Sequence, residues 1–221
     1  MAKPLEIWTR WGTLATVFSP RTNRELHALI ASLCVLFEDM RIELSGQAEA
    51  DLGALDECNK EGRKLYFLRR SVATLYEFST MIQELDRLPS FQSIKATFEP
   101  AHQKTWATAV RYFKKYNKYV TRLRHNIGGH FGRQAATLAI ENLLPDAGGF
   151  LEVIFYEKGA GAKFCFENEI AATGVLQHVP VDNIAAKSRR LVRHAVVGYR
   201  KAARAVDCIT RCYLWDRFGK G

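Results

Sequence analysis

Apolar residues recur every three or four positions along most of the chain, a spacing typical of amphipathic helices. The clearest run predicts a core-facing helix from about Lys60 to Leu88, ended by Pro89. Residues 46–58 before it are mostly acidic or small and are predicted to form a loop. The apolar stripe of the predicted helix consists of Leu65, Leu68, Val72, Leu75, Phe78, Met81, Ile82 and Leu85.

Two further helices are predicted before that loop. The first covers roughly residues 4–18, where apolar positions have near-helical spacing. The second begins either at Ser19-Pro20, with proline in the first turn, or at a capping box formed by Thr22 and Glu25. Its apolar stripe ends near Gly46.

Helical patterns also dominate the second half of the chain. A short helix is predicted over residues 91–98, and a long one opens at Pro100. Another helical pattern follows a glycine pair and reaches about Leu144. The last helix is predicted from Asp182 or Asn183, either of which can cap it, to Phe218.

One stretch departs from the helical period. Residues 150–167 alternate and are rich in aromatic and β-branched side chains, on both sides of a turn-like segment from Lys158 to Gly161. This pattern predicts a β-hairpin. The sequence therefore predicts a mainly α fold: a helical bundle in a single domain, residues 1–221, with the hairpin inserted before a long C-terminal helix.

Composition narrows the class of protein. The chain has 221 residues, of which 48% are hydrophobic, as in globular proteins. Its first residues lack the apolar core of a signal peptide, and no uncharged apolar run reaches the roughly 18 residues of a spanning helix. We expect a soluble cytoplasmic protein with no membrane partner. Five scattered cysteines argue against a disulfide framework, and buried structural thiols are expected instead.

Charge is distributed unevenly along the chain. Residues 1–100 hold 12 Lys/Arg and 14 Asp/Glu, whereas residues 101–221 hold 20 and 9, a balance of +11. No acid occurs between Glu99 and Glu141, or between Asp182 and Asp207. Stretches with positive charge only are typical of a surface that binds a polyanion, most often a nucleic acid. A solvated basic surface without a partner is the simpler alternative.

The sequence RHNIGGHFG, residues 124–132, interrupts the basic helical stretch. Two glycines inside a helix cost about 1 kcal/mol each relative to alanine. They indicate either a kink or loop between two helices, or a close approach of the backbone to a second subunit or a phosphate. Arg124 follows Val120 by one helical turn, which places it near the apolar face, where an arginine needs an anionic or hydrogen-bonding partner.

Arginine and histidine in this pattern suit cleavage of RNA without a metal. A neutral imidazole, as of His130, can take the proton of a 2′-hydroxyl, and a guanidinium, as of Arg124, can stabilise charge on the phosphorus centre. His125 and His130 are five residues apart rather than four, so they do not share a helix face as a zinc pair does. We therefore expect neither a metal nor a cofactor.

Residues Arg124 to His130 resemble the motif of HEPN-domain proteins, in which an arginine and a polar residue precede a histidine by a short interval. Five residues intervene here, and His125 occupies the polar position. The resemblance implies an all-helical, metal-independent endoribonuclease of toxin–antitoxin or phage-defence type, acting as a homodimer whose two motifs share one cleft. It implies that Arg124 and His130 are catalytic, with His125 and Asn126 supporting the phosphate or the motif.

The basic helix that leads into the motif supplies further candidates. Lys115, Lys118 and Arg122 are expected to bind RNA, while Tyr112, Tyr116 and Tyr119 between them either pack or stack on bases. Two other functions stay open: a nucleic-acid-binding module without activity, and an interaction module whose basic face meets an acidic protein such as an antitoxin or a defence-system component. The remaining histidines, which are expected to lie on the surface or in the core, are His27, His102, His178 and His194.

Overall fold

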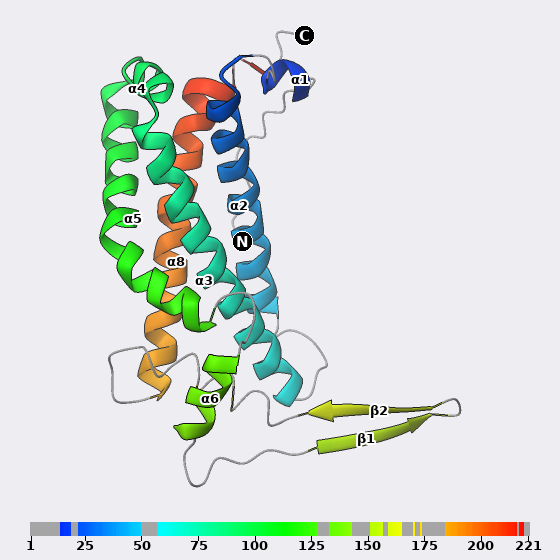
Figure 1. Cartoon of the computed structure of the whole chain (residues 1–221). Helices are drawn as coiled ribbons and strands as arrows, with labels where there is room; N and C mark the ends of the chain where they lie inside the picture. The colour runs from blue at the N-terminus through cyan, green and yellow to red at the C-terminus, as the bar shows by residue number, and fades with distance from the viewer. Residues whose placement is uncertain are drawn as a thin grey trace. The chain divides into compact units, whose positions relative to one another are not determined.

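A computed structural model describes residues 14–18, 22–49, 57–127, 133–142, 151–156, 159–164, 170, 173, 184–215 and 217–218. Most of them are helical, which confirms a mainly α fold (Figure 1). The helices are α1 (Leu14–Val17), α2 (Arg24–Glu49), α3 (Glu57–Arg87), α4 (Pro89–Lys95), α5 (Pro100–Ile127), α6 (Arg133–Glu141) and α8 (Ile184–Ile209), followed by the π-helical turn η1 (Thr210–Leu214). Strands β1 (Leu151–Tyr156) and β2 (Gly159–Phe164) pair antiparallel, with Leu151 opposite Phe164.

The chain divides into two compact units. The first unit comprises residues 1–37, 78–114 and 200–221, and the second unit comprises residues 38–77 and 115–199. The four long helices α2, α3, α5 and α8 contribute residues to both units. Because each unit draws on separate stretches of sequence, neither is a contiguous sequence domain, and a single domain over residues 1–221 stays a prediction.

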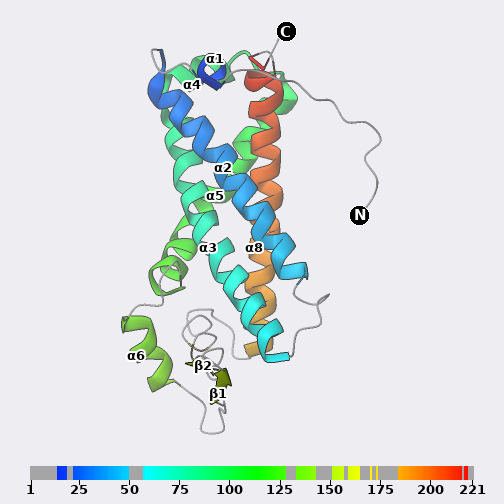
Figure 2. The same ribbon diagram turned by 90° about the vertical axis from the view of Figure 1, so that its right-hand side faces the viewer.

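Aromatic packing between helices forms the core of the first unit, in which the segments of α2, α3, α5 and α8 lie side by side (Figures 1 and 2). Phe78 of α3 and Phe113 of α5 have ring centroids 5.2 Å apart. Phe91 of α4 lies 4.8 Å from the wholly buried ring of Trp106. The apolar stripe predicted for residues 65–85 faces inward, because Leu68, Val72, Leu75, Phe78, Ile82 and Leu85 are all buried.

A polar corner fixes the turn between α3 and α5 in the first unit. The carboxylate atom Oδ1 of Asp86 accepts hydrogen bonds from Trp106 Nε1 at 2.7 Å and from Lys95 Nζ at 2.8 Å. The backbone carbonyl of Asp86 also accepts one from the side chain of Gln92. Pro89 opens α4 and Pro100 opens α5, where proline costs no helical hydrogen bond. This corner therefore sets where the basic helix α5 begins.

Close contacts at glycines mark the core of the second unit. A Cβ atom added to Gly46 of α2 would lie 2.5 Å from the ring of Phe67, and one added to Gly198 of α8 would lie 2.6 Å from Leu75. The prediction that the second helix ends near Gly46 is wrong, since α2 continues to Glu49. The reason is physical: this glycine allows α3 to approach α2 closely and does not terminate the helix.

Other helix boundaries are confirmed or moved by a few residues. The long helix does open at Pro100 and α3 begins at Glu57, inside the predicted loop, of which residues 50–56 lie outside the described residues. Helix α2 begins at Arg24, after Asn23, whose φ is 51° and whose carbonyl accepts the His27 amide at 3.0 Å. Of the predicted first helix, only Leu14–Val17 falls among the described helical residues.

Two general expectations concern membranes and cysteines. Among the described residues, no helix combines the length and the apolarity needed to cross a bilayer. Cys208 is buried, which raises the pKa of its thiol to about 11, and Cys34 and Cys212 are half-buried. These three agree with structural roles, while the side chains of Cys58 and Cys165 lie outside the described residues.

Candidate nucleic-acid interface

The motif begins in the last turn of α5. Arg124, His125 and Asn126 belong to this helix, which ends at Ile127, directly before the glycine pair. His130 lies outside the described residues, as do the side chains of Lys118, Arg122, Arg124, His125 and Asn126. The glycines therefore coincide with the end of a helix, while the catalytic and supporting roles of the motif residues stay predictions.

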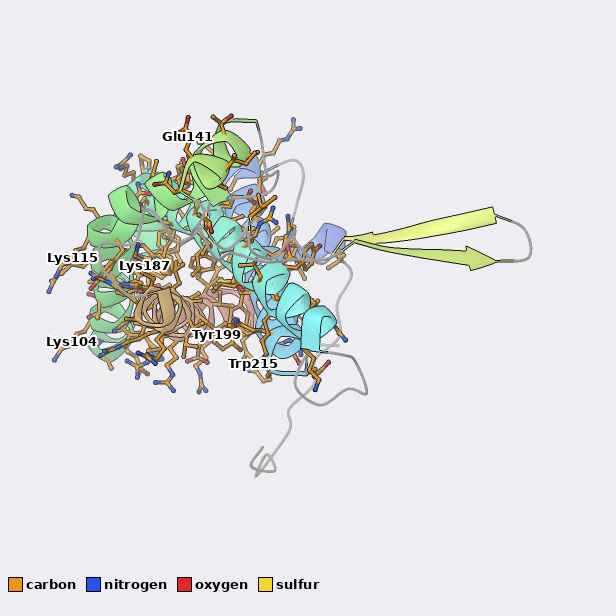
Figure 3. All side chains as sticks on the ribbon, turned by 90° about the horizontal axis from the view of Figure 1, so that it is seen from below. Lys104, Lys115, Glu141, Lys187, Tyr199 and Trp215 are labelled. Carbon is orange, nitrogen blue, oxygen red and sulfur yellow. The ribbon has the colours of Figure 1, made fainter. Side chains whose placement is uncertain are left out.

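A basic stripe runs along α5 and leads toward the motif. Lys104, Arg111 and Lys115 are exposed and follow one another at intervals of seven and four residues, which places them on one helix face. Figure 3 shows Lys104 and Lys115 projecting away from α5. Helical positions 118 and 122 continue the same line. Trp106, Ala109 and Phe113, all buried, occupy the opposite face.

A second basic stripe runs along α8. Arg189, Arg193, Arg200 and Arg204 are exposed, with spacings of four, seven and four residues that keep them on one face. The opposite face is buried and apolar, with Leu191, Ala195, Ala202, Ala205 and Ile209 in the core. The exposed cations of α5 and α8 from the two acid-free stretches thus lie on the outward face of each helix, where the structure describes them.

These stripes are not neutralised by neighbouring carboxylates within the part of the chain that the structure describes. Salt bridges occur elsewhere on helices, as between Arg41 and Glu38 and between Arg211 and Asp207, both at 2.7 Å. Among the described residues, none involves the stripe cations Lys104, Arg111, Lys115, Arg189, Arg193, Arg200 and Arg204. Where the structure describes them, these faces therefore present positive charge to solvent without an ion-pair partner among the described residues.

Helices α5 and α8 are in contact in each unit. In the first unit, the Cys208 thiol approaches the carbonyl oxygen of His102 at 3.7 Å. In the second unit, the rings of Tyr116 and His194 have centroids 5.4 Å apart and an interplanar angle of 56°. Nζ of Lys115 lies 5.7 Å from the centroid of the Tyr116 ring. In the second unit, the α5–α8 contact therefore lies next to cations of both helices, Lys115 on α5 and Arg193 on α8.

His194 differs from the other described histidines in its surroundings. Burial lowers the pKa of its imidazole below the ordinary value, and the positive charges of Arg190 and Arg193 lower it further. His194 is therefore neutral near pH 7. His27, by contrast, is a buried histidine whose Nε2 lies 2.8 Å from the hydroxyl of Tyr213, as expected of a core residue.

The sequence did not single out the contact between Tyr116 and His194. Each residue lies in an acid-free basic stretch, which was a usable signal, but no periodicity connects two segments so far apart along the chain. Tyr112 packs edge-on against Phe113 at 5.3 Å. Among the described residues, no group of three or more His, Cys, Asp or Glu side chains is arranged to hold a metal ion.

Comparison of the chain with models of protein families, with curated proteins and with solved structures finds no match.

Proposed function

We propose that this chain is a metal-independent, HEPN-like endoribonuclease that acts on cytoplasmic RNA, in toxin–antitoxin or phage-defence systems. The observation that carries the proposal is the basic stripe of α5, which is exposed, uncompensated within the described residues, and on the same helix whose last turn holds Arg124. Phosphate neutralisation by such cations supplies most of the affinity of proteins for nucleic acids.

The proposed reaction needs only the residues of the motif and the RNA itself. His130 accepts the proton of a 2′-hydroxyl, and the 2′-oxygen forms a bond to the adjacent phosphorus. The bond from phosphorus to the 5′-oxygen of the next nucleotide breaks, and that oxygen receives a proton from the imidazolium. The products are a 2′,3′-cyclic phosphate and a 5′-hydroxyl. Arg124 stabilises the additional negative charge of the transition state.

The supporting residues are assigned by the same proposal. Lys115, Lys118 and Arg122 hold the RNA backbone, and His125 and Asn126 orient the phosphate or the motif. A homodimer brings two motifs into one cleft, and the β1–β2 pair is an elaboration of the helical domain before its last helix. The molar mass in solution tests the dimer: a strict monomer that cleaves RNA would refute the shared cleft.

The test of the enzyme is cleavage of total RNA by purified protein in EDTA. We expect Arg124→Ala to lower the rate by roughly 10²–10³-fold and His130→Ala by roughly 10²–10⁴-fold, the usual losses for a charge-stabilising group and a general base. Arg87→Ala is the matched control, because Arg87 is exposed and lies on α3, away from the motif in sequence. Circular dichroism establishes that each variant is folded. Folded wild type that leaves RNA intact would contradict the proposal.

The same stripes favour a second function, a nucleic-acid-binding module without cleavage, because they bind RNA whether or not the motif is active. This module predicts affinity that falls steeply with salt while the RNA stays intact. A third function is an interaction module whose basic face meets an acidic protein, such as an antitoxin or a defence-system component. Recovery of the chain from its host with nucleic acid alone would argue against that third function.

A further inference from the structure

The contact between α5 and α8 in the second unit gathers cations that the sequence places in two separate stretches. Tyr116 of α5 meets His194 of α8, with ring centroids 5.4 Å apart. Lys115 precedes Tyr116, and its Nζ lies 5.7 Å from the centre of that ring. Arg193 precedes His194, and Arg190 lies one helical turn before it. Both arginines and Lys115 are exposed.

The arrangement of charge on these helices costs stability. Arg189 and Arg193 are four residues apart, as are Arg111 and Lys115, and like charges at this spacing destabilise a helix by about 0.2–0.5 kcal/mol per pair. The same chain uses the favourable arrangement elsewhere, where Asp207 pairs with Arg211 at 2.7 Å. An anionic ligand that lies across the like-charged pairs would offset this cost.

The electrostatic surroundings of His194 give independent support. Burial lowers the pKa of the His194 imidazole, and the positive charges of Arg190 and Arg193 lower it further. Positive charge from α8 therefore acts on the ring that contacts Tyr116 of α5.

We propose that Lys115 of α5, with Arg189 and Arg193 of α8, forms a surface beside the Tyr116–His194 contact that binds the phosphate backbone of single-stranded RNA. This inference rests on the proposed function for the choice of RNA as ligand. The second unit also contains position 124, in the last turn of α5. The surface is a binding site and has no part in the bond-breaking step.

The test is binding of a fluorescently labelled single-stranded RNA oligonucleotide to the full chain in EDTA, measured by anisotropy over a range of KCl concentrations. Each phosphate contact contributes about 0.7 to the slope of log K against log salt for single strands. The double variant Arg189→Ala/Arg193→Ala removes two contacts. The magnitude of the slope should therefore decrease by about 1.4, and affinity should decrease by roughly 25-fold at 0.1 M salt. Circular dichroism checks the fold of every variant.

A matched double variant separates a local site from a general loss of charge. Arg63→Ala/Arg87→Ala removes the same charge from exposed positions of α3 and should leave the slope within about 0.3 of wild type. An equal fall in both double variants would overturn the proposal, because net charge alone would then explain binding. Wild type that fails to bind RNA at low salt would also overturn it.

The outcomes also distinguish this surface from the nuclease. If the magnitude of the slope decreases only in the Arg189→Ala/Arg193→Ala variant, the binding surface is supported. If wild type also never cleaves RNA, the proposed nuclease activity is refuted while the surface stands. If wild type cleaves RNA and the double variant has the same slope as wild type, the binding surface is refuted and the nuclease proposal stands. Displacement of the RNA by polyglutamate at equal charge concentration would assign the surface to an acidic protein and refute RNA as its ligand.

Discussion

The corner at Asp86 offers a stringent test of the packing that positions α5. Trp106 is wholly buried, and its Nε1 donates a hydrogen bond of 2.7 Å to Asp86 Oδ1. Replacing Asp86 with alanine leaves this N–H buried without an acceptor, which costs about 1–3 kcal/mol. The lost ion pair with Lys95 adds less than about 1 kcal/mol, because both side chains are about a quarter exposed.

A double-mutant cycle isolates the hydrogen bond from the rest of the corner. Trp106→Phe removes the donor and keeps an aromatic ring against Phe91, whose centroid lies 4.8 Å away. If the bond matters, the two substitutions are not additive, and we expect a coupling free energy of about 1–2 kcal/mol. Asp86→Asn keeps an acceptor for Trp106 and should cost less than about 1 kcal/mol, since mainly the ion pair is lost.

Urea unfolding followed by circular dichroism measures all four proteins of the cycle. Glu84→Ala is the control, because Glu84 is exposed on the same helix two residues before Asp86, and its effect should stay within about 0.5 kcal/mol. A coupling below about 0.5 kcal/mol would refute the reasoning, because independent sites add to within that limit. The corner would then be held by ring packing alone.

Three further changes test contacts in each unit. Gly198→Ala should destabilise the protein by about 1 kcal/mol, since overpacking against buried Leu75 exceeds the helical gain of alanine, and unfolding in a Leu75→Ala background should lose that penalty. Tyr213→Phe should cost about 0.5–1.5 kcal/mol in urea unfolding by removing the hydrogen bond between its hydroxyl and buried His27. Burial raises the pKa of the Glu43 carboxyl, so its contribution to stability is full below the unfolded pKa and is lost as pH rises through the folded value. Wild type should therefore lose stability relative to Glu43→Gln as the pH rises above about 4, and a difference that does not vary with pH would refute this.

The predictable part of the fold is the part that local periodicity determines. The stripe from Leu68 to Leu85 becomes the buried face of α3, and Pro100 opens α5 as the sequence predicts. Gly46 was misinterpreted because a glycine has the same local signal whether it ends a helix or admits a neighbouring ring, and only the contact with Phe67 decides. The π-helical turn at Thr210–Leu214 likewise has no distinctive sequence pattern.

The candidate site, like the fold, is predictable from the sequence only where local patterns determine it. Gaps between acids predicted two basic faces, and both are exposed where the structure describes them. The contact of Tyr116 with His194 depends on how α5 and α8 meet, which is a property of the tertiary structure and has no counterpart in either segment alone. The charge of the candidate interface is therefore predictable from the sequence, whereas the contact that joins its two helices is not.

Helical geometry bears on how RNA bound along α5 would reach the motif. Lys104, Arg111 and Lys115 lie on one line that helical positions 118 and 122 extend, whereas position 124 is about 200° further around the helix from position 122. An RNA strand that follows the stripe thus approaches Arg124 of the same chain only by passing around the helix end. A second copy of the chain, placed by a two-fold axis, can present its own motif to that strand directly. Under the proposed function, this offset between stripe and position 124 is what a cleft shared by two copies would resolve.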